Sequence, residues 1–149
     1  MNKQKVFGLT FSALALSMSV STLNAAELDI SITNATKGIY FTPILVAAHD
    51  SSLFMFRTGE TASAELEAMA EGGDISGLSS VITNAGGVVS ENPASGILNP
   101  GVTTSLTIDT GDLKYLSLSA MLLPTNDGFV GLDSWKIPDQ TGTYKVSLN

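Results

Sequence analysis

The stretch Val102–Leu123, VTTSLTIDTGDLKYLSLSAMLL, decides the fold class of this chain. Residues 102–108 are rich in threonine and branched side chains, which favour an extended strand. Residues 115–123 alternate in polarity with a period of two, which also indicates a strand. Residues 110–112, Thr-Gly-Asp, are typical of a hairpin turn. The stretch therefore predicts two strands that pair in an antiparallel manner.

Further strands are expected on both sides of this stretch. Residues 27–33 alternate between apolar and polar side chains, which predicts a strand with one solvent-exposed face. Residues 39–48 form a nearly continuous apolar run that Thr42-Pro43 interrupts, so we expect a buried or edge strand with a bend. Residues 144–148 alternate again and predict a last strand. Asn34-Ala35-Thr36 fits a glycosylation sequon, a pattern too short to carry weight.

One convincing helix is expected between these strands. Residues 61–73 are rich in alanine and glutamate, place Leu66 and Met69 at helical spacing and end in two glycines. We interpret the glutamates as the solvent-exposed face of this helix, with a partner-binding face as the alternative. Asp74 could cap a second short turn, although Gly77 weakens that prediction. The expected fold is mainly β, an antiparallel Greek-key β-sandwich with one inserted α-helix.

The first 25 residues have the three-part pattern of a secretory signal peptide. Lys3 and Lys5 form a basic start, an apolar run follows over residues 6–20, and Ala25 offers a cleavage site. A membrane anchor is the alternative, but a run of about 15 residues is shorter than the roughly 20 that span a bilayer. We expect a domain over residues 26–149 that is secreted, periplasmic or at the cell surface, without stable membrane insertion.

The charge of the chain excludes some classes of partner. The formal net charge is −7, and without Lys3 and Lys5 of the leader it becomes −9. Such a surface repels phosphate backbones and anionic lipids, so no nucleic-acid partner is expected. The same carboxylates favour divalent cations. The chain has no cysteine, so no disulfide holds an exported form together.

Catalytic motifs are scarce. With one histidine and no cysteine, the chain cannot build a zinc site of the usual kind. A Ser-His-Asp site would have to use His49, and no Gly-x-Ser-x-Gly motif accompanies it. We therefore expect a protein that is not an enzyme, in which only a site rich in Asp and Glu could hold a hard metal ion.

The stretch Leu122–Ser134 carries the densest set of candidate metal ligands. Asn126, Asp127 and Asp133 supply amide and carboxylate oxygens, the donors that calcium prefers. The spacing fails the helix-loop-helix calcium template, because the acidic positions differ and the twelfth position is not glutamate. A plain turn is the alternative, since Asn-Asp-Gly is a strong turn former. Both a calcium site and a simple turn stay open at this point.

Several blocks of residues resemble the spondin domain, above all its bacterial exported members. They follow the order of that family and span about Glu27 to Leu132. The blocks are Thr42–Asp50 (TPILVAAHD), Leu53-Phe54, Gly59–Ser63 (GETAS) with Leu66, Ala70–Gly73 (AEGG) and Leu123–Gly131 (LPTNDGFVG).

The resemblance implies a β-sandwich with lipid-binding-domain topology, an extracellular setting and a calcium ion at one end of the sandwich. Asp127 matches the aspartate that is one ligand in the family. Two further acidic ligands belong to a later Asp-x-Gly-Thr-Asp/Glu segment, and this sequence ends at Asn149 before any such segment. The resemblance thus implies a domain truncated at its C-terminus, with a weak or incomplete calcium site and without its last strand.

Two hypotheses follow from the sequence. The first is an exported, non-enzymatic binding or matrix-type module with a partial calcium site and an unidentified extracellular partner. The alternative is a truncated, metal-free structural domain that self-associates through an exposed sheet edge.

Overall fold

The computed structural model describes residues 27–148, so the predicted leader over residues 1–25 lies outside the described residues. The chain forms mainly strands, joined by two short helices. In chain order the elements are β1 (Glu27–Thr33), β2 (Tyr40–Phe41), β3 (Leu45–His49), α1 (Ala64–Gly72), α2 (Ser76–Asn84), β4 (Val88–Glu91), β5 (Thr103–Asp109), β6 (Tyr115–Leu123) and β7 (Phe129–Lys136).

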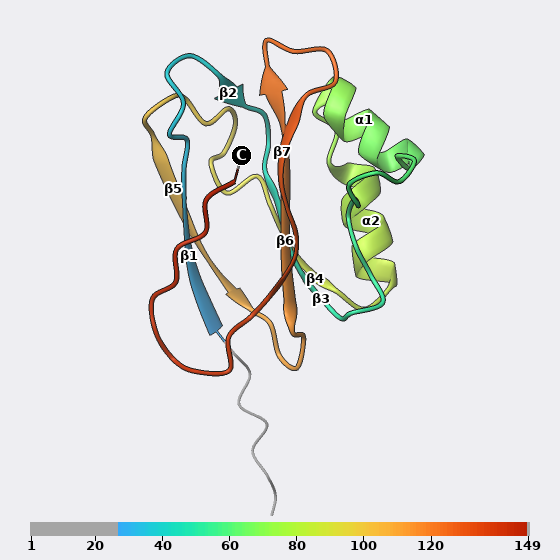
Figure 1. Ribbon diagram of the computed structural model, residues 1–149, viewed down its shortest axis with the longest axis vertical. Helices are drawn as coiled ribbons and strands as arrows, with labels where there is room; N and C mark the ends of the chain where they lie inside the picture. The colour runs from blue at the N-terminus through green and yellow to red at the C-terminus, as the bar shows by residue number, and fades with distance from the viewer. Residues whose placement is uncertain (1–26, 149) are drawn as a thin grey trace, which may run out of the picture.

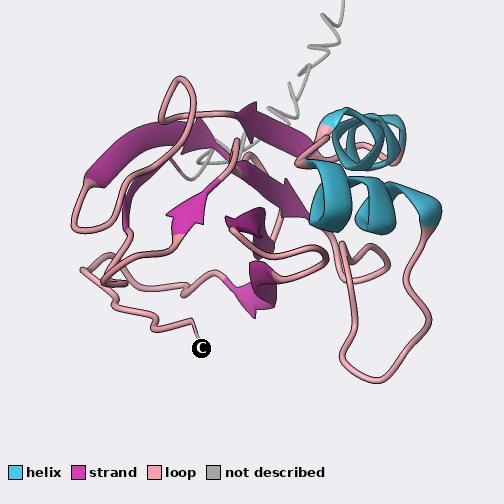
Figure 2. Cartoon of the chain, turned by 90° about the horizontal axis from the view of Figure 1, so that it is seen from above, coloured by secondary structure: helices cyan, strands magenta, loops and turns pink. Residues whose placement is uncertain are grey.

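The strands form two antiparallel sheets. β1 pairs with β5, while β6 lies at the centre of a five-stranded sheet in the order β2, β6, β3, β4, with β7 also paired to β6. β1 and β5 lie on one side of the central strands and both helices on the other (Figure 1). Figure 2 shows the two helices together at one side of the strands. The predicted antiparallel β-sandwich is confirmed.

The central sheet is covered on both faces, and this explains the continuous apolar run around β3. All five residues of β3 are buried. Leu45 and Ala47 face the helices, whereas Val46 faces the β1-β5 sheet. The residues that share this inter-sheet face form the inter-sheet cluster: Phe41, Ile44, Val46, Leu98, Leu116, Leu118, Ala120 and Ile137. A strand buried on both faces has no polar side to alternate with.

The predicted pairing of residues 102–108 with residues 115–123 is wrong. β5 pairs over its whole length with β1, and β6 belongs to the other sheet. The turn that joins them crosses from one sheet to the other. The Asp109 carboxylate accepts a hydrogen bond from the Gly111 amide at 3.0 Å, and Gly111 has a φ of 53°. Such turn residues suit a bend between sheets as well as a hairpin.

The prediction of one inserted helix is also corrected, since the chain forms two. Ser63 caps the start of α1, since its Oγ accepts the Leu66 amide at 3.2 Å, and Gly73, with a φ of 69°, caps its end. The N-cap of α2 is Ile75, which has no side-chain cap bond, so Asp74 does not cap the helix as predicted. Asp74 Oδ1 instead accepts the Ser76 amide at 2.9 Å in the turn before α2. Gly77 lies within α2 and does not break it. A Cβ at this position would lie 2.9 Å from Cγ of Glu65 on α1. This glycine lets the two helices approach each other closely.

The predicted last strand over residues 144–148 is wrong, because this segment has no regular secondary structure. Tyr144 instead donates its hydroxyl to the backbone oxygen of Gln140 at 2.9 Å. Its ring meets that of Trp135 at a centroid distance of 6.3 Å. Tyr144 therefore stabilises a loop and does not take part in strand pairing.

Candidate functional site

The stretch Leu122–Ser134 contains the turn that joins β6 to β7 and most of β7 itself. Thr125 organises this turn: its hydroxyl donates to the Leu122 carbonyl at 2.6 Å and accepts the Gly128 amide at 3.0 Å. The Leu122 amide also donates to the Gly128 carbonyl at 2.8 Å. These bonds hold the backbone of the turn, and the two residues between Thr125 and Gly128 are exposed.

Asn126 and Asp127 are those two residues, and both are exposed. Within residues 27–148, neither side chain makes a hydrogen bond or an ion pair. Their amide and carboxylate oxygens are available to a ligand. The structure therefore brings two of the three predicted ligands together.

Asp133 is not brought to the same place. It lies on β7, four residues beyond Phe129, which corresponds to roughly 13 Å of strand. The pairing of β7 with β6 is irregular here, Ser134 has a φ of 48°, and its amide donates to Ser117 Oγ at 2.9 Å. The Asp133 carboxylate accepts the Ser134 hydroxyl at 2.7 Å. Calcium ligands lie within about 2.6 Å of the ion, so Asp133 cannot share an ion with Asp127 in this conformation.

Two glutamates of α1 lie on the groove that Asp127 borders. This groove has a volume of about 240 Å³. Its lining comprises Ala62, Leu66, Glu67, Ala70, Glu71, Asp127 and Phe129. Glu67 and Glu71 are four residues apart, so they share one face of the helix. Glu67 and Glu71 are exposed, as the sequence interpretation of a solvent-exposed helix face expected. Together with Asp127 they place three carboxylates along a groove whose other lining residues are apolar.

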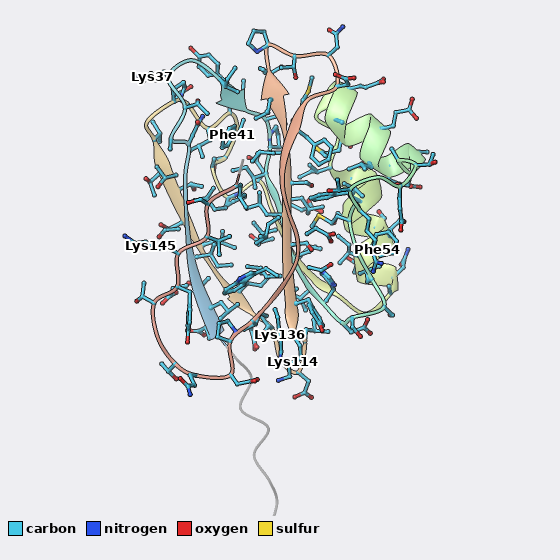
Figure 3. All side chains as sticks on the ribbon, viewed as in Figure 1. Lys37, Phe41, Phe54, Lys114, Lys136 and Lys145 are labelled. Carbon is cyan, nitrogen blue, oxygen red and sulfur yellow. The ribbon has the colours of Figure 1, made fainter. Side chains whose placement is uncertain are left out.

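Few basic groups could neutralise this groove. Arg57 lies over the ring of Phe54, 4.2 Å from its centroid. The labelled lysines lie away from α1 and the β6-β7 turn in Figure 3. These lysines are Lys37, Lys114, Lys136 and Lys145. The groove is therefore an acidic part of the surface.

The groove residues fit a calcium ion only in part. Carboxylates and an amide are suitable donors, but calcium takes six to eight oxygens. No group of three or more acidic or histidine side chains among the described residues is close enough to hold a metal. Asp127 and Asn126 could hold an ion whose remaining ligands are water, a glutamate that moves from α1, or a partner molecule.

A second polar cluster contains the only histidine and has a different character. His49 Nδ1 lies 2.7 Å from the Asp50 carbonyl oxygen, and its Nε2 lies 2.7 Å from Ser117 Oγ. A carbonyl only accepts, so Nδ1 carries the proton and Nε2 accepts the serine hydroxyl. Ser117 in turn accepts the Ser134 amide. His49 is 1% exposed and Ser117 0%, so this Ser-His pair is closed to solvent.

The Asn34 side chain is also buried with every polar atom paired. Its Nδ2 donates to the carbonyls of Ile39 at 2.8 Å and Leu98 at 3.0 Å. Its Oδ1 accepts the amide and the hydroxyl of Thr36. A glycan would attach to Nδ2, whose two protons are both engaged. The sequon at Asn34 is therefore inaccessible to glycosylation in the folded chain.

The comparison with protein families gives the setting of this site. Residues 33–149 match the model of the Spondin_N family, which covers everything from the end of β1 onward. The chain belongs to the spondin N-terminal domain family. No curated protein matches the chain significantly. Membership of this family indicates, at a coarse level, a secreted protein of the extracellular matrix type.

The structure also bears on membrane insertion. Among residues 27–148, no helix is both long and apolar enough to span a bilayer.

Proposed function

We propose that this spondin-family chain is an exported, non-enzymatic binding or matrix-type module whose β6-β7 turn holds calcium weakly. The observation that carries the proposal is the exposed Asp127 carboxylate, which has no partner among the described residues and shares a groove with Glu67 and Glu71. A carboxylate without a partner, beside two further carboxylates, favours a cation.

The chemistry of the turn supports calcium rather than a softer metal. The donors are oxygens from a carboxylate and an amide, and the described part of the chain offers one histidine, which is buried elsewhere. A bound calcium ion would reduce the repulsion between the turn and α1. The residues that would hold it are Asp127 and Asn126, with Glu67 or Glu71 as a further ligand.

The affinity should be low, because the protein supplies few ligands. Incomplete extracellular sites bind calcium with dissociation constants on the order of 10⁻⁴ to 10⁻³ M. At a calcium concentration about ten times the dissociation constant, binding would stabilise the fold by about 1.4 kcal/mol. Calcium would therefore order the turn against α1 and would not decide whether the chain folds.

Thermal unfolding with calcium and with a chelator tests the site. We expect calcium to raise the melting temperature of the wild type by about 5 °C and to leave Asp127→Asn unchanged. Asp112→Asn is the matched control, since Asp112 is exposed in the turn at the opposite end of β6. It should respond to calcium as the wild type does. Equal melting temperatures for the wild type in both conditions would contradict the site and favour a metal-free structural domain.

The burial of His49 and Ser117 supports a role without catalysis. A nucleophile must reach its substrate, and this pair is fully engaged inside the sheet. Screening with generic ester and glycoside substrates checks this part of the proposal. Hydrolysis that His49→Asn abolishes would overturn it.

A further inference from the structure

The turn between β6 and β7 contains the one Asp-Gly pair of the sequence, Asp127-Gly128. An aspartate followed by glycine is open to a spontaneous rearrangement of the backbone, because glycine has no Cβ to shield its nitrogen from the preceding carboxyl group. Asp127 is exposed, and its carboxyl group has no partner among residues 27–148 that would keep it from turning toward this nitrogen. The aspartate half of the pair is therefore free to move.

The rearrangement proceeds through a ring. The Gly128 nitrogen bonds to the side-chain carbonyl carbon of Asp127, the amide proton and the carboxyl hydroxyl leave together as water, and a cyclic imide forms. Water then opens the ring at either carbonyl. Opening at the side-chain carbonyl restores aspartate, whereas opening at the main-chain carbonyl leaves isoaspartate, in which the backbone runs through the side chain. One water leaves and one returns, so the product is an isomer of unchanged mass.

The glycine half of the pair is held by Thr125. The Gly128 amide donates to the Thr125 hydroxyl oxygen at 3.0 Å. The same hydroxyl donates its proton to the Leu122 carbonyl at 2.6 Å, which leaves a lone pair for the amide. The Gly128 carbonyl accepts the Leu122 amide at 2.8 Å, so the glycine is bonded on both sides. The attacking nitrogen is therefore fixed, although the carboxyl group beside it is not.

The hydrogen bond from Gly128 to Thr125 opposes ring formation directly. The imide nitrogen carries no proton, so this bond must break before the ring can close. An interaction that is present in the folded turn and absent in the transition state raises the barrier. A hydrogen bond of ordinary net strength then corresponds to about a tenfold lower rate.

The same contact explains why glycine occupies position 128. A Cβ there would lie 2.7 Å from Oγ1 of Thr125, so a side chain would push the hydroxyl away from the amide. The residue that makes the pair reactive is thus the one that admits the protecting hydroxyl. We propose that Asp127-Gly128 is a site of isoaspartate formation and that Thr125 suppresses the reaction by holding the Gly128 amide. Neither the reaction nor its suppression requires calcium.

Asp133-Ser134 offers a reference within the same chain. The Ser134 amide donates to Ser117 Oγ at 2.9 Å, and the Asp133 carboxylate accepts the Ser134 hydroxyl at 2.7 Å. Both halves of this pair are held, and Thr125 takes no part in either bond. A change at Thr125 should therefore leave isoaspartate formation at Asp133 unaltered.

Peptide mapping of the folded chain after prolonged incubation with chelator tests the proposal. Thr125→Val keeps the shape of the side chain and removes the acceptor, so isoaspartate at residue 127 should form about tenfold faster than in the wild type. Thr125→Ser keeps the hydroxyl and should match the wild type. Thr107→Val is the matched control, since it removes an exposed threonine hydroxyl on β5 and should leave the rate at residue 127 unchanged.

Incubation in urea supplies the unprotected reference. Unfolding breaks the bond to Gly128, so the wild type and both Thr125 variants should then form isoaspartate at one common, faster rate. Amide hydrogen exchange separates this bond from a general loosening of the turn. In the folded chain, Thr125→Val should lose protection at the Gly128 amide and keep it at the Leu122 amide.

Three results would overturn the proposal. The first is an equal rate at residue 127 in the folded wild type and in folded Thr125→Val. The second is an equal rate in the folded and the unfolded wild type. The third is a faster reaction in Thr125→Val that comes with lost protection at Leu122, because the turn as a whole would then be responsible. Chelator is present throughout, so none of these results bears on calcium binding.

Discussion

Asn34 and Asn126 are the same residue type in opposite environments. Asn34 is buried, and all its polar atoms are paired with Thr36 and with the carbonyls of Ile39 and Leu98. Asn126 lies exposed in a turn beside Asp127, and neither side chain has a partner among the described residues. Buried polar groups must be paired to avoid a desolvation penalty. The contrast separates residues that hold the fold from residues that remain free to bind.

The largest expected effect comes from Asn34→Ala. The substitution removes three hydrogen bonds of a buried side chain, those to the Ile39 and Leu98 carbonyls and that from the Thr36 amide. We therefore expect unfolding in urea to show a loss of about 3 kcal/mol in the free energy of unfolding. Asn34→Asp should cost a similar amount, because it keeps the shape and Oδ1 but has no amide proton to donate. A decrease in the free energy of unfolding below about 1 kcal/mol for both variants would contradict a structural role of Asn34.

Ser117→Ala should have the next largest effect. It removes the donor to His49 Nε2 and the acceptor for the Ser134 amide, both in a buried place. Urea unfolding should therefore show a loss of about 2 kcal/mol. Ser105→Ala is the control, since its hydroxyl is exposed, and it should change stability by less than about 0.5 kcal/mol. Equal losses for the two serines would argue against a special role of the buried pair.

Asn126→Ala should have the smallest effect. In the presence of chelator it should leave the free energy of unfolding within about 0.5 kcal/mol of the wild type, because no partner is lost. The same urea titration measures it. A loss above about 1 kcal/mol would show that the amide stabilises the turn itself and would weaken the contrast with Asn34.

The sequence predicted the strands well where local pattern decides them. The alternation in β1 and the apolar run around β3 reflect one-sided and two-sided burial, so both strands could be predicted. Strand pairing could not, because residues 110–112 suit a turn within a sheet or between sheets. α2 was underestimated because Gly77 resembles a helix breaker, whereas its lack of a side chain lets α2 pack on α1. The period-two pattern of residues 144–148 lacks a ladder partner among the described residues.

The candidate site could be predicted only in its local part. Asn126 and Asp127 are neighbours in one turn, so their proximity follows from the sequence. Asp133 is separated from them because the chain between is an extended strand. Glu67 and Glu71 lie about 60 residues earlier, and only the packing of α1 beside the hairpin brings them to the same groove. The family resemblance identified the domain but not these two carboxylates.

A calcium titration followed by two-dimensional amide NMR tests the central claim most directly. We predict shifts that saturate in the millimolar range at the amides of residues 125–129, with smaller shifts around Glu67 and Glu71. The amides of Asp133 and Ser134 should not move, and Asp127→Asn should abolish the shifts at the turn. If calcium moves no amide near Asp127, or moves amides beside all exposed carboxylates alike, the turn does not form a specific site.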